Sequence, residues 1–223
     1  MQQRSEHINH ELQQLQNKLL RMAALSKEAI ENAVRTMKGD CAALAKSVID
    51  GDQIINQLEV DIEQEGLKFI ALYQPEAIDL RTVISILRMV TDIERIGDLA
   101  VNIARSSLEL TCKDDFTQML DLPYLADMVL SMYQDALHSF VDENIELAKK
   151  TIESDKNVNQ LCNQFFRELI VHMMQNPQKI SSYIQFLLVS RHLERVGDHC
   201  KNIAEVTYFI THGKNIKHHQ NEI

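Results

Sequence analysis

Two separate stretches of the sequence recur about one hundred residues further along the chain. Residues 44–58 align with residues 147–161 at eight identities in fifteen positions. Residues 80–105 align with residues 180–205 at nine identities in twenty-six positions. An internal repeat of this length means that both halves share one local structure. The sequence therefore predicts a tandem duplication.

Each half has the residue spacing of three long helices. Leu12, Leu15, Leu19 and Met22 recur every three or four positions, which places them on one side of a helix. Little interrupts such helices, since the chain has only three Pro and six Gly. The sequence shows no strand pattern. The expected helices cover about 12–37, 41–73 and 76–111 in the first half, and in the second a helix starting at 122, then about 143–175 and 179–211.

Turn-forming residues stand where these helices are expected to end. Asp40 follows the first helix and is a candidate N-cap for the second. Pro75 and Pro177 follow the second helix of each half, which has to stop before them. Gly213 ends the last helix. Gly51 lies inside an expected helix and is a place where that helix could break.

The expected fold class is all-α, a tandem repeat of two antiparallel three-helix bundles with six long helices. The first repeat covers residues 1–112, the second covers residues 120–213, and residues 214–223 form a loose tail. The sequence leaves open whether the bundles are joined end to end or side by side.

Charge and cysteine usage narrow the class of protein. A net charge of −9 argues against a nucleic-acid partner, because phosphate backbones require a basic surface. No window approaches the roughly 20 apolar residues that span a bilayer, and the polar N-terminal stretch does not resemble a secretory signal. Cys41, Cys112, Cys162 and Cys200 are far apart and are expected to be free thiols in a reducing compartment. These features favour a cytoplasmic protein without membrane insertion.

The second recurring stretch places charged residues inside an apolar helical pattern. It reads DIERIGDLAVNIAR at residues 92–105 and HLERVGDHCKNIAE at residues 192–205. Glu94, Asp98 and Asn102 are spaced by four, so each is turned only about 40° from the previous one and all three line one stripe. The second copy has the same stripe, formed by Glu194, Asp198 and Asn202.

Carboxylates four residues apart repel each other, so a positive group is expected beside each stripe. The candidates are Arg95, Arg195, an incoming lysine or a metal ion. Carboxylate and amide oxygens are the ligands that hard or borderline cations prefer, and the two stripes offer enough of them for one multinuclear site or two separate ones. A single pair of this kind is common on solvated helices. Its recurrence in both halves favours a function, with preservation for helix packing as the alternative.

A glycine lies inside each motif, at Gly97 and Gly197. A glycine within a helix costs about 1 kcal/mol relative to alanine. Its presence in both copies indicates close backbone approach, either of another helix or of a bound ion, and helix packing is the simpler explanation.

Other polar residues flank the motifs. Arg95 and Arg195 point off the stripes and are expected to form local ion pairs, for instance Arg95 with Asp92, or else to face a partner. His192, His199 and Cys200 flank the second motif and would suit a softer metal site. The first copy has different residues at these positions, which argues against a role shared by both repeats.

Two segments of this chain resemble the signature segments of the PhoU family, the phosphate-signalling proteins of bacteria. They are PEAIDLRTVISILRMVTDIERIGDLAVNIAR and LERVGDHCKNIAE. The resemblance covers nearly the whole chain and includes DLR at residues 79–81, ERIGD at residues 94–98 and ERVGD at residues 194–198.

The resemblance implies a regulator that is not an enzyme. Proteins of this family are cytoplasmic, commonly form homodimers, and couple the ATPase of a high-affinity phosphate ABC transporter to a membrane sensor histidine kinase. They act as negative regulators: when phosphate is plentiful they hold the starvation response off and restrain uptake.

The resemblance also implies metal sites, because some members bind iron, zinc or other metals through the acidic motif. It implies no organic cofactor. The second copy departs from the first, with Ile-Ser-Ser at residues 180–182 in place of DLR and His192 in place of Asp92, so the two sites can differ in metal preference. Carried over to this chain, the candidate metal ligands are Glu94, Asp98, Asn102, Glu194, Asp198 and Asn202.

Three other interpretations compete with the adaptor. A carboxylate-bridged di-iron enzyme would use Glu-x-x-His pairs, and the chain contains none. An inert helical scaffold would carry the acidic stripes merely as solvated faces. A PhoU-like paralogue could serve another transporter with the same fold. The sequence has no Gly-rich phosphate loop, so phosphate is not expected to bind in a dedicated pocket.

Overall fold

The structure, a computed structural model, describes residues 2–38, 41–110 and 121–213. Within these ranges every long element is a helix and no strand occurs, which confirms the all-α fold class. The first repeat consists of α1 (Gln2–Thr36), α2 (Ala42–Tyr73) and α3 (Ala77–Leu108), and the second of α4 (Asp121–Val141), α5 (Ile145–Gln175) and α6 (Ile180–His212).

Two helix starts differ from the sequence expectation. Helix α1 begins at Gln2, well before the apolar stripe, and the side chain of His7 bonds the hydroxyl of Tyr73 on α2 at 3.0 Å, which holds this extension in place. Helix α5 begins two residues later than expected because Asn144 caps it, accepting a hydrogen bond from the backbone N–H of Leu147 at 3.0 Å. The proposed cap Asp40 lies outside the described residues.

The helix ends follow the turn-forming residues. Helix α2 runs unbroken through Gly51 and stops where Gln74 adopts a left-handed φ of 48° ahead of Pro75. Helix α6 stops at Gly213, whose φ of 68° is a left-handed conformation that glycine adopts without strain. A single turn of 3-10 helix, Pro177–Lys179, precedes α6.

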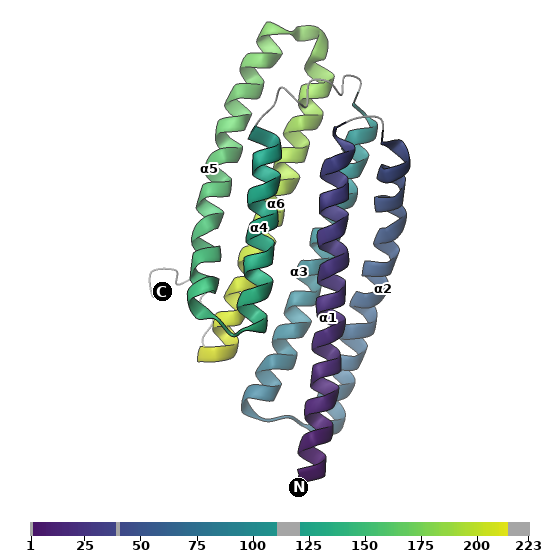
Figure 1. The fold of residues 1–223 in the computed structure, drawn as a ribbon, viewed down its shortest axis with the longest axis vertical. Coiled ribbons are helices and arrows are strands. Elements are labelled where there is room, and N and C mark those ends of the chain that lie inside the picture. The colour runs from purple at the N-terminus through teal and green to yellow at the C-terminus, as the bar shows by residue number, and fades with distance from the viewer. Residues whose placement is uncertain (1, 39–40, 111–120, 214–223) are drawn as a thin grey trace.

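The two three-helix bundles lie side by side, which decides between the two arrangements that the sequence left open. Helices α3 and α6 run antiparallel and form the main contact between the bundles (Figure 1). The bundles are staggered along their length. The end of α5 and the start of α6 extend beyond the first repeat at one end of the molecule, and the α2–α3 connection extends beyond the second repeat at the other (Figure 1).

One hydrophobic core runs through both bundles. Met22 and Ile93 from the first repeat and Phe186 and Leu193 from the second are wholly buried in the same apolar cluster. Such continuity makes the two repeats one packed body rather than two independent domains. Among the described residues, no helix has the length and apolar character needed to cross a bilayer.

Candidate functional site

The stripe on α3 faces carboxylates on α2, which packs antiparallel beside it. Burial first, then the negative charges of Asp98 and Glu59, raise the pKa of Glu94 above its usual value. Burial and neighbouring carboxylates likewise raise the pKa of Glu59. The pKa of Asp52 is raised by burial, although a hydrogen bond from Asn56 opposes the shift. These four carboxylates form what we call the first cluster: Asp52, Glu59, Glu94 and Asp98.

Asp52 has one satisfied and one unsatisfied oxygen. Its Oδ2 accepts a hydrogen bond from the amide of Asn56 at 3.1 Å. Its Oδ1 is buried and has no hydrogen-bond partner. This atom lies against α3, because a Cβ added at Gly97 would stand 3.1 Å from it. Gly97 therefore permits the carboxylate of Asp52 to approach the backbone of α3, which confirms the expected close helix packing.

Arg95 offsets part of the negative charge in the first cluster, and the charge of Arg105 opposes the rise in the pKa of Asp52. Arg95 donates to Asp98 Oδ2 at 3.2 Å, and its Nε lies 3.4 Å from Glu94 Oε2. Its side chain is 55 % exposed, so this pairing is weak. Four carboxylates beside these two arginines leave the first cluster negative.

The second repeat has a matching group between α5 and α6. Burial first, then the negative charges of Asp155 and Glu194, raise the pKa of Asp198. Arg191 donates to Glu194 Oε2 at 2.6 Å, which ties one of these carboxylates to a partly exposed cation. These residues, together with a thiol, form what we call the second cluster: Asp155, Cys162, Glu194 and Asp198.

Asp155 repeats the unsatisfied oxygen of the first cluster. The residue is only 5 % exposed. Its Oδ2 accepts from Asn159 at 3.3 Å and from Lys201 at 3.5 Å, whereas its Oδ1 is buried without a partner. A Cβ added at Gly197 would lie 3.8 Å from that oxygen. The same atom is thus left unpaired beside the same glycine in both repeats.

The thiol of Cys162 distinguishes the second cluster from the first. It takes the place of Glu59, since the recurring stretches are offset by 103 residues, and it donates a long hydrogen bond of 3.6 Å to the carbonyl of Ser190. Burial, and next the charge of Glu194, raise the pKa of Cys162 to about 12. The second cluster therefore offers a neutral thiol where the first offers a carboxylate.

The two clusters are separate. Every carboxylate that raises the pKa of Glu94 belongs to the first repeat, and every one that raises the pKa of Asp198 belongs to the second. Buried oxygens without a donor are what a cation would satisfy, so the donor set fits a metal ion. In the part of the chain that the structure describes, however, no three His, Cys, Asp or Glu side chains already converge as metal ligands. Coordination would require some of these side chains to change rotamer.

The two asparagines of the stripes behave differently. Asn102 is half-buried on α3. Asn202 instead donates to Asp92 of the first repeat at 2.9 Å, and His199 bonds the same oxygen at 2.8 Å. The side chain of Asp92 thus forms hydrogen bonds with residues of the other repeat. The expected Arg95–Asp92 pair is wrong, because Arg95 pairs with its neighbours in the first cluster.

The flanking residues of the second motif do not gather into a soft site in the structure. Cys200 is wholly buried in the core, and burial raises its pKa well above the ordinary value. His192 is half-buried with an unpartnered Nδ1, and burial, followed by the charge of Arg195, lowers its pKa. The free thiols expected from the sequence are observed at Cys41, Cys162 and Cys200, while Cys112 lies outside the described residues.

Sequence reasoning missed Asp52 and Asp155 as members of the clusters. A signal for them existed, because both belong to the recurring stretch and each has an asparagine four residues later. That Asp-x-x-x-Asn pattern, duplicated at an offset of 103 residues, is as regular as the motif on α3 and α6.

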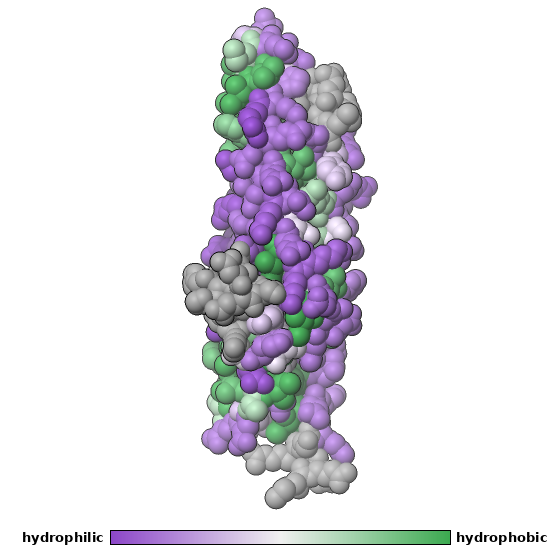
Figure 2. All heavy atoms as spheres, turned by 90° about the vertical axis from the view of Figure 1, so that its left-hand side faces the viewer, coloured by the Kyte–Doolittle hydropathy of each residue, from purple (hydrophilic) through white to green (hydrophobic). Residues whose placement is uncertain are grey.

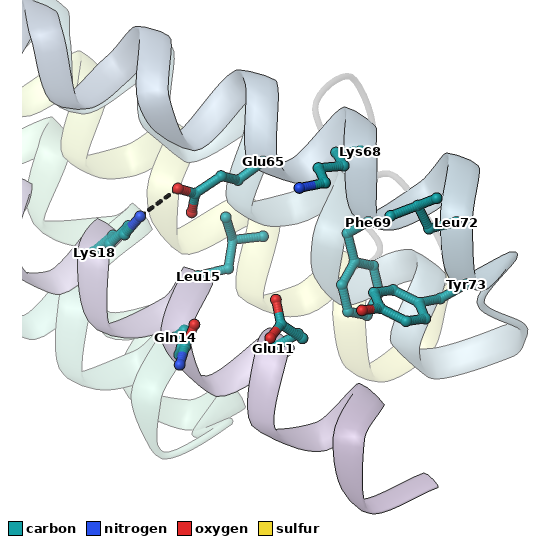
Figure 3. A pocket seen from close by; sticks show the side chains of 9 residues that line it. All are labelled: Glu11, Gln14, Leu15, Lys18, Glu65, Lys68, Phe69, Leu72 and Tyr73. Atoms are coloured by element: carbon teal, nitrogen blue, oxygen red, sulfur yellow. Dashed lines mark hydrogen bonds and ion pairs between the residues drawn. The ribbon is translucent and has the colours of Figure 1, made fainter. Parts of the chain in front are cut away.

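A pocket of about 330 Å³ opens elsewhere, between the first half of α1 and the last turns of α2 (Figure 3). Leu15, Phe69 and Tyr73 form its apolar wall. Its charges are balanced, since two lysines and two glutamates line it and Lys18 pairs with Glu65. The pocket shares no residue with either cluster.

Comparison with known proteins places the chain in a family. The model of the PhoU domain matches residues 19–107 and 122–207. The phosphate-specific transport system accessory protein PhoU homolog of Aquifex aeolicus is 38% identical over 208 residues, covering 93% of this chain and 94% of that protein. The phosphate-specific transport system accessory protein PhoU of Escherichia coli is 32% identical over 214 residues, covering 96% and 89%.

Solved structures agree with the sequence comparisons. The crystal structure of PhoU from Pseudomonas aeruginosa has a TM-score of 0.84 at 33% identity and covers 92% of this chain and 99% of that one. The crystal structure of the phosphate transport system regulatory protein PhoU from Streptococcus pneumoniae has a TM-score of 0.85 at 28% identity, covering 94% and 99%. A family match in both repeats, over the helices that carry the two clusters, shows that this chain belongs to the PhoU family.

Proposed function

We propose that this protein is a cytoplasmic, non-enzymatic accessory of a phosphate transport system. It acts as an adaptor between the ATPase of a high-affinity phosphate ABC transporter and a sensor histidine kinase, and represses the starvation response when phosphate is plentiful. The observation that carries the proposal is family membership over nearly the full length, with proteins named for this accessory role as relatives. A rigid bundle suits an adaptor because it presents fixed helical faces to its partners.

The two clusters are proposed to hold divalent or iron cations. The first cluster would bind through Glu94, Asp98 and Asp52, whose unpaired Oδ1 supports the assignment. The second would bind through Glu194, Asp198 and the equivalent buried oxygen of Asp155. A bound cation would supply positive charge where the ion pairs of the protein offset the carboxylates only in part.

The donor sets of the clusters differ, so their metal preferences should differ as well. A thiol favours softer ions such as zinc or ferrous iron, and binding would displace its proton. We therefore assign the softer preference to the second cluster, through Cys162, and the harder preference to the first, through Glu59.

The experiment that tests the function is secreted phosphatase activity in phosphate-rich medium, measured in the source bacterium lacking this gene. We expect high phosphatase activity without the gene and repression when the natural protein is supplied. A second strain receives the quadruple variant Glu94→Ala, Asp98→Ala, Glu194→Ala and Asp198→Ala. Equal accumulation of both proteins, checked by immunoblot, is the control.

The outcomes separate the alternatives. Failure of the quadruple variant to repress would make the clusters functional, whereas repression by it would make them mainly architectural. Unchanged phosphatase on deletion would contradict the proposal and favour a PhoU-like paralogue or a scaffold that serves another transporter.

A further inference from the structure

The pocket between the first half of α1 and the last turns of α2 contains two charges that have no partner in the protein. Lys18 and Glu65 pair with each other, so their charges offset one another (Figure 3). Glu11 and Lys68 also line the pocket, and within the described part of the chain neither forms an ion pair or a side-chain hydrogen bond. The pocket therefore offers one free carboxylate and one free ammonium group.

These two free charges lie on opposite walls of the pocket. Glu11 belongs to α1 and Lys68 to α2, and Figure 3 shows both side chains turned toward the space between the helices. Two opposite charges that face each other without pairing fit a ligand that carries both signs: its ammonium group would meet Glu11, and its carboxylate would meet Lys68. A ligand with only one sign of charge would leave one of these groups without a partner.

The surface between the two charges is apolar. Leu15 and Phe69 are almost wholly buried and close the pocket on its inner side, whereas Leu72 is 60% exposed at its edge. An apolar group that covers Leu72 removes this surface from water, which favours binding by about 25 cal/mol for each Å² covered. The ring of Tyr73 adds to the same wall, and its hydroxyl is already bonded to His7 at 3.0 Å.

Size and charge limit the ligand further. The volume of about 330 Å³ lies at the lower end of the roughly 300–1,000 Å³ that is usual for ligand pockets, so the ligand is a small molecule. The net charge of −9 on the chain disfavours an anion, whereas a molecule without net charge is not repelled. An ammonium group, a carboxylate and an apolar side chain in one small molecule describe an amino acid.

The second repeat lacks this arrangement. The repeats are offset by 103 residues in the first half of the second helix and by 102 residues at the proline that follows it, so Lys68 corresponds to Val171 or Ile170. Both of these side chains are apolar and partly exposed. Figure 2, viewed from the α5 side, accordingly shows hydrophobic residues gathered at this upper end of the molecule. The charged pocket is therefore specific to the first repeat.

We propose that this pocket binds a free amino acid with an apolar side chain, such as leucine or phenylalanine. Glu11 accepts hydrogen bonds from its ammonium group, Lys68 donates to its carboxylate, and its side chain covers Leu72. The bound amino acid connects the N-terminal part of α1 to the end of α2, beside the bond between His7 and Tyr73. The proposal depends neither on metal binding nor on the regulatory role.

Isothermal titration calorimetry of the natural chain with L-leucine and with L-phenylalanine tests the proposal. We expect a dissociation constant on the order of 0.1–1 mM for at least one of them, which suits so small a ligand. Two derivatives of the amino acid that binds are the matched probes: the N-acetyl form lacks the ammonium charge, and the amide lacks the carboxylate. Each should bind about tenfold more weakly or worse, because one charge of the pocket keeps no partner.

Variants locate the binding in the pocket. Glu11→Gln and Lys68→Gln each remove one charge and should weaken binding about tenfold or more, with circular dichroism as the check that both remain folded. The matched control is Lys46→Gln, which removes an exposed charge near the start of α2 and should bind as the natural chain does. In the natural chain, the methyl NMR signals of Leu15 and Leu72 should shift during the titration.

Three results would overturn the proposal. The first is the absence of binding by both amino acids up to about 10 mM. The second is binding of the acetylated or amidated probe as tight as that of the parent amino acid. The third is unchanged binding by the variants at Glu11 and Lys68, which would place any bound amino acid elsewhere on the protein.

Discussion

Gly97 and Gly197 occupy equivalent positions but have unequal neighbours. A Cβ at Gly97 would lie 3.1 Å from both Asp52 Oδ1 and Ile55 Cδ1. At Gly197 the nearest atom would be Val158 Cγ1 at 3.3 Å, with the carboxylate farther away. The cost of adding a methyl group should therefore differ between repeats.

We expect Gly97→Ala to lower the free energy of unfolding by about 1 kcal/mol, because crowding exceeds the gain in helix propensity. Gly197→Ala should be neutral or slightly stabilising, since the same gain of about 1 kcal/mol meets less crowding. Urea unfolding of both variants beside the natural chain measures the difference. Equal effects would show that the side chains facing Gly97 move aside freely.

At the scale of elements, each antiparallel helix pair concentrates negative charge. Helices α2 and α3 form the first cluster, and α5 and α6 form the second. The pKa values of Asp52, Glu94 and Asp198 are all raised in the folded protein, burial being the main cause in each case. A carboxyl whose pKa is raised by folding binds more protons in the native state than in the unfolded state, so its contribution to stability falls as pH rises through the raised pKa.

In the metal-free protein, the contribution of these carboxyls to the free energy of unfolding should consequently fall as pH rises from about 4 to 7. The variant Glu94→Gln/Asp198→Asn should show a shallower loss and gain about 0.5 kcal/mol at neutral pH. Urea unfolding at several pH values, with Glu153→Gln as an exposed control, measures this. Manganese or zinc should stabilise the natural chain and have less effect on the variant. A variant with the natural pH profile would contradict the role assigned to the clusters.

At the scale of the whole molecule, buried polar contacts join the two bundles. The hydroxyl of Tyr133 on α4 lies 2.7 Å from that of Ser26 on α1 and 3.3 Å from the carbonyl of Ala23. Tyr133 is wholly buried, and burial raises its pKa far above the usual range, so this hydroxyl stays protonated and can donate. Asp92 on α3 makes a second connection, through hydrogen bonds with His199 and Asn202 on α6.

We expect Tyr133→Phe to lower the free energy of unfolding by about 1 kcal/mol, because a buried hydrogen bond between the repeats is lost while the ring remains packed. The loss stays moderate since Ser26 keeps its bond to the carbonyl of Ala23 at 3.0 Å. Denaturant unfolding measures the change, with Tyr124→Phe at an exposed site as control. A change as small as that of the control would mean that water replaces the hydroxyl.

The sequence by itself determined the helices, the duplication and the acidic stripes. Helical spacing is a local property: residues four apart share a face whatever surrounds them, so the alignment of Glu94 with Asp98 follows from the chain alone. Proline and glycine fixed the helix ends for the same reason, as the stops before Pro75 and at Gly213 show. Because the second repeat has the same residue spacing, each local prediction made for the first repeat also applied to the second.

Only the tertiary structure decided what faces each stripe and which ends are left uncovered. Asp52 joins the first cluster because α2 packs antiparallel to α3, and Asn202 turns to Asp92 because the bundles lie side by side. The stagger of the bundles leaves the end of the α5–α6 hairpin beyond the first repeat (Figure 1). These features depend on contacts between residues distant in sequence, and such contacts are fixed by the packing of whole helices rather than by the spacing within one.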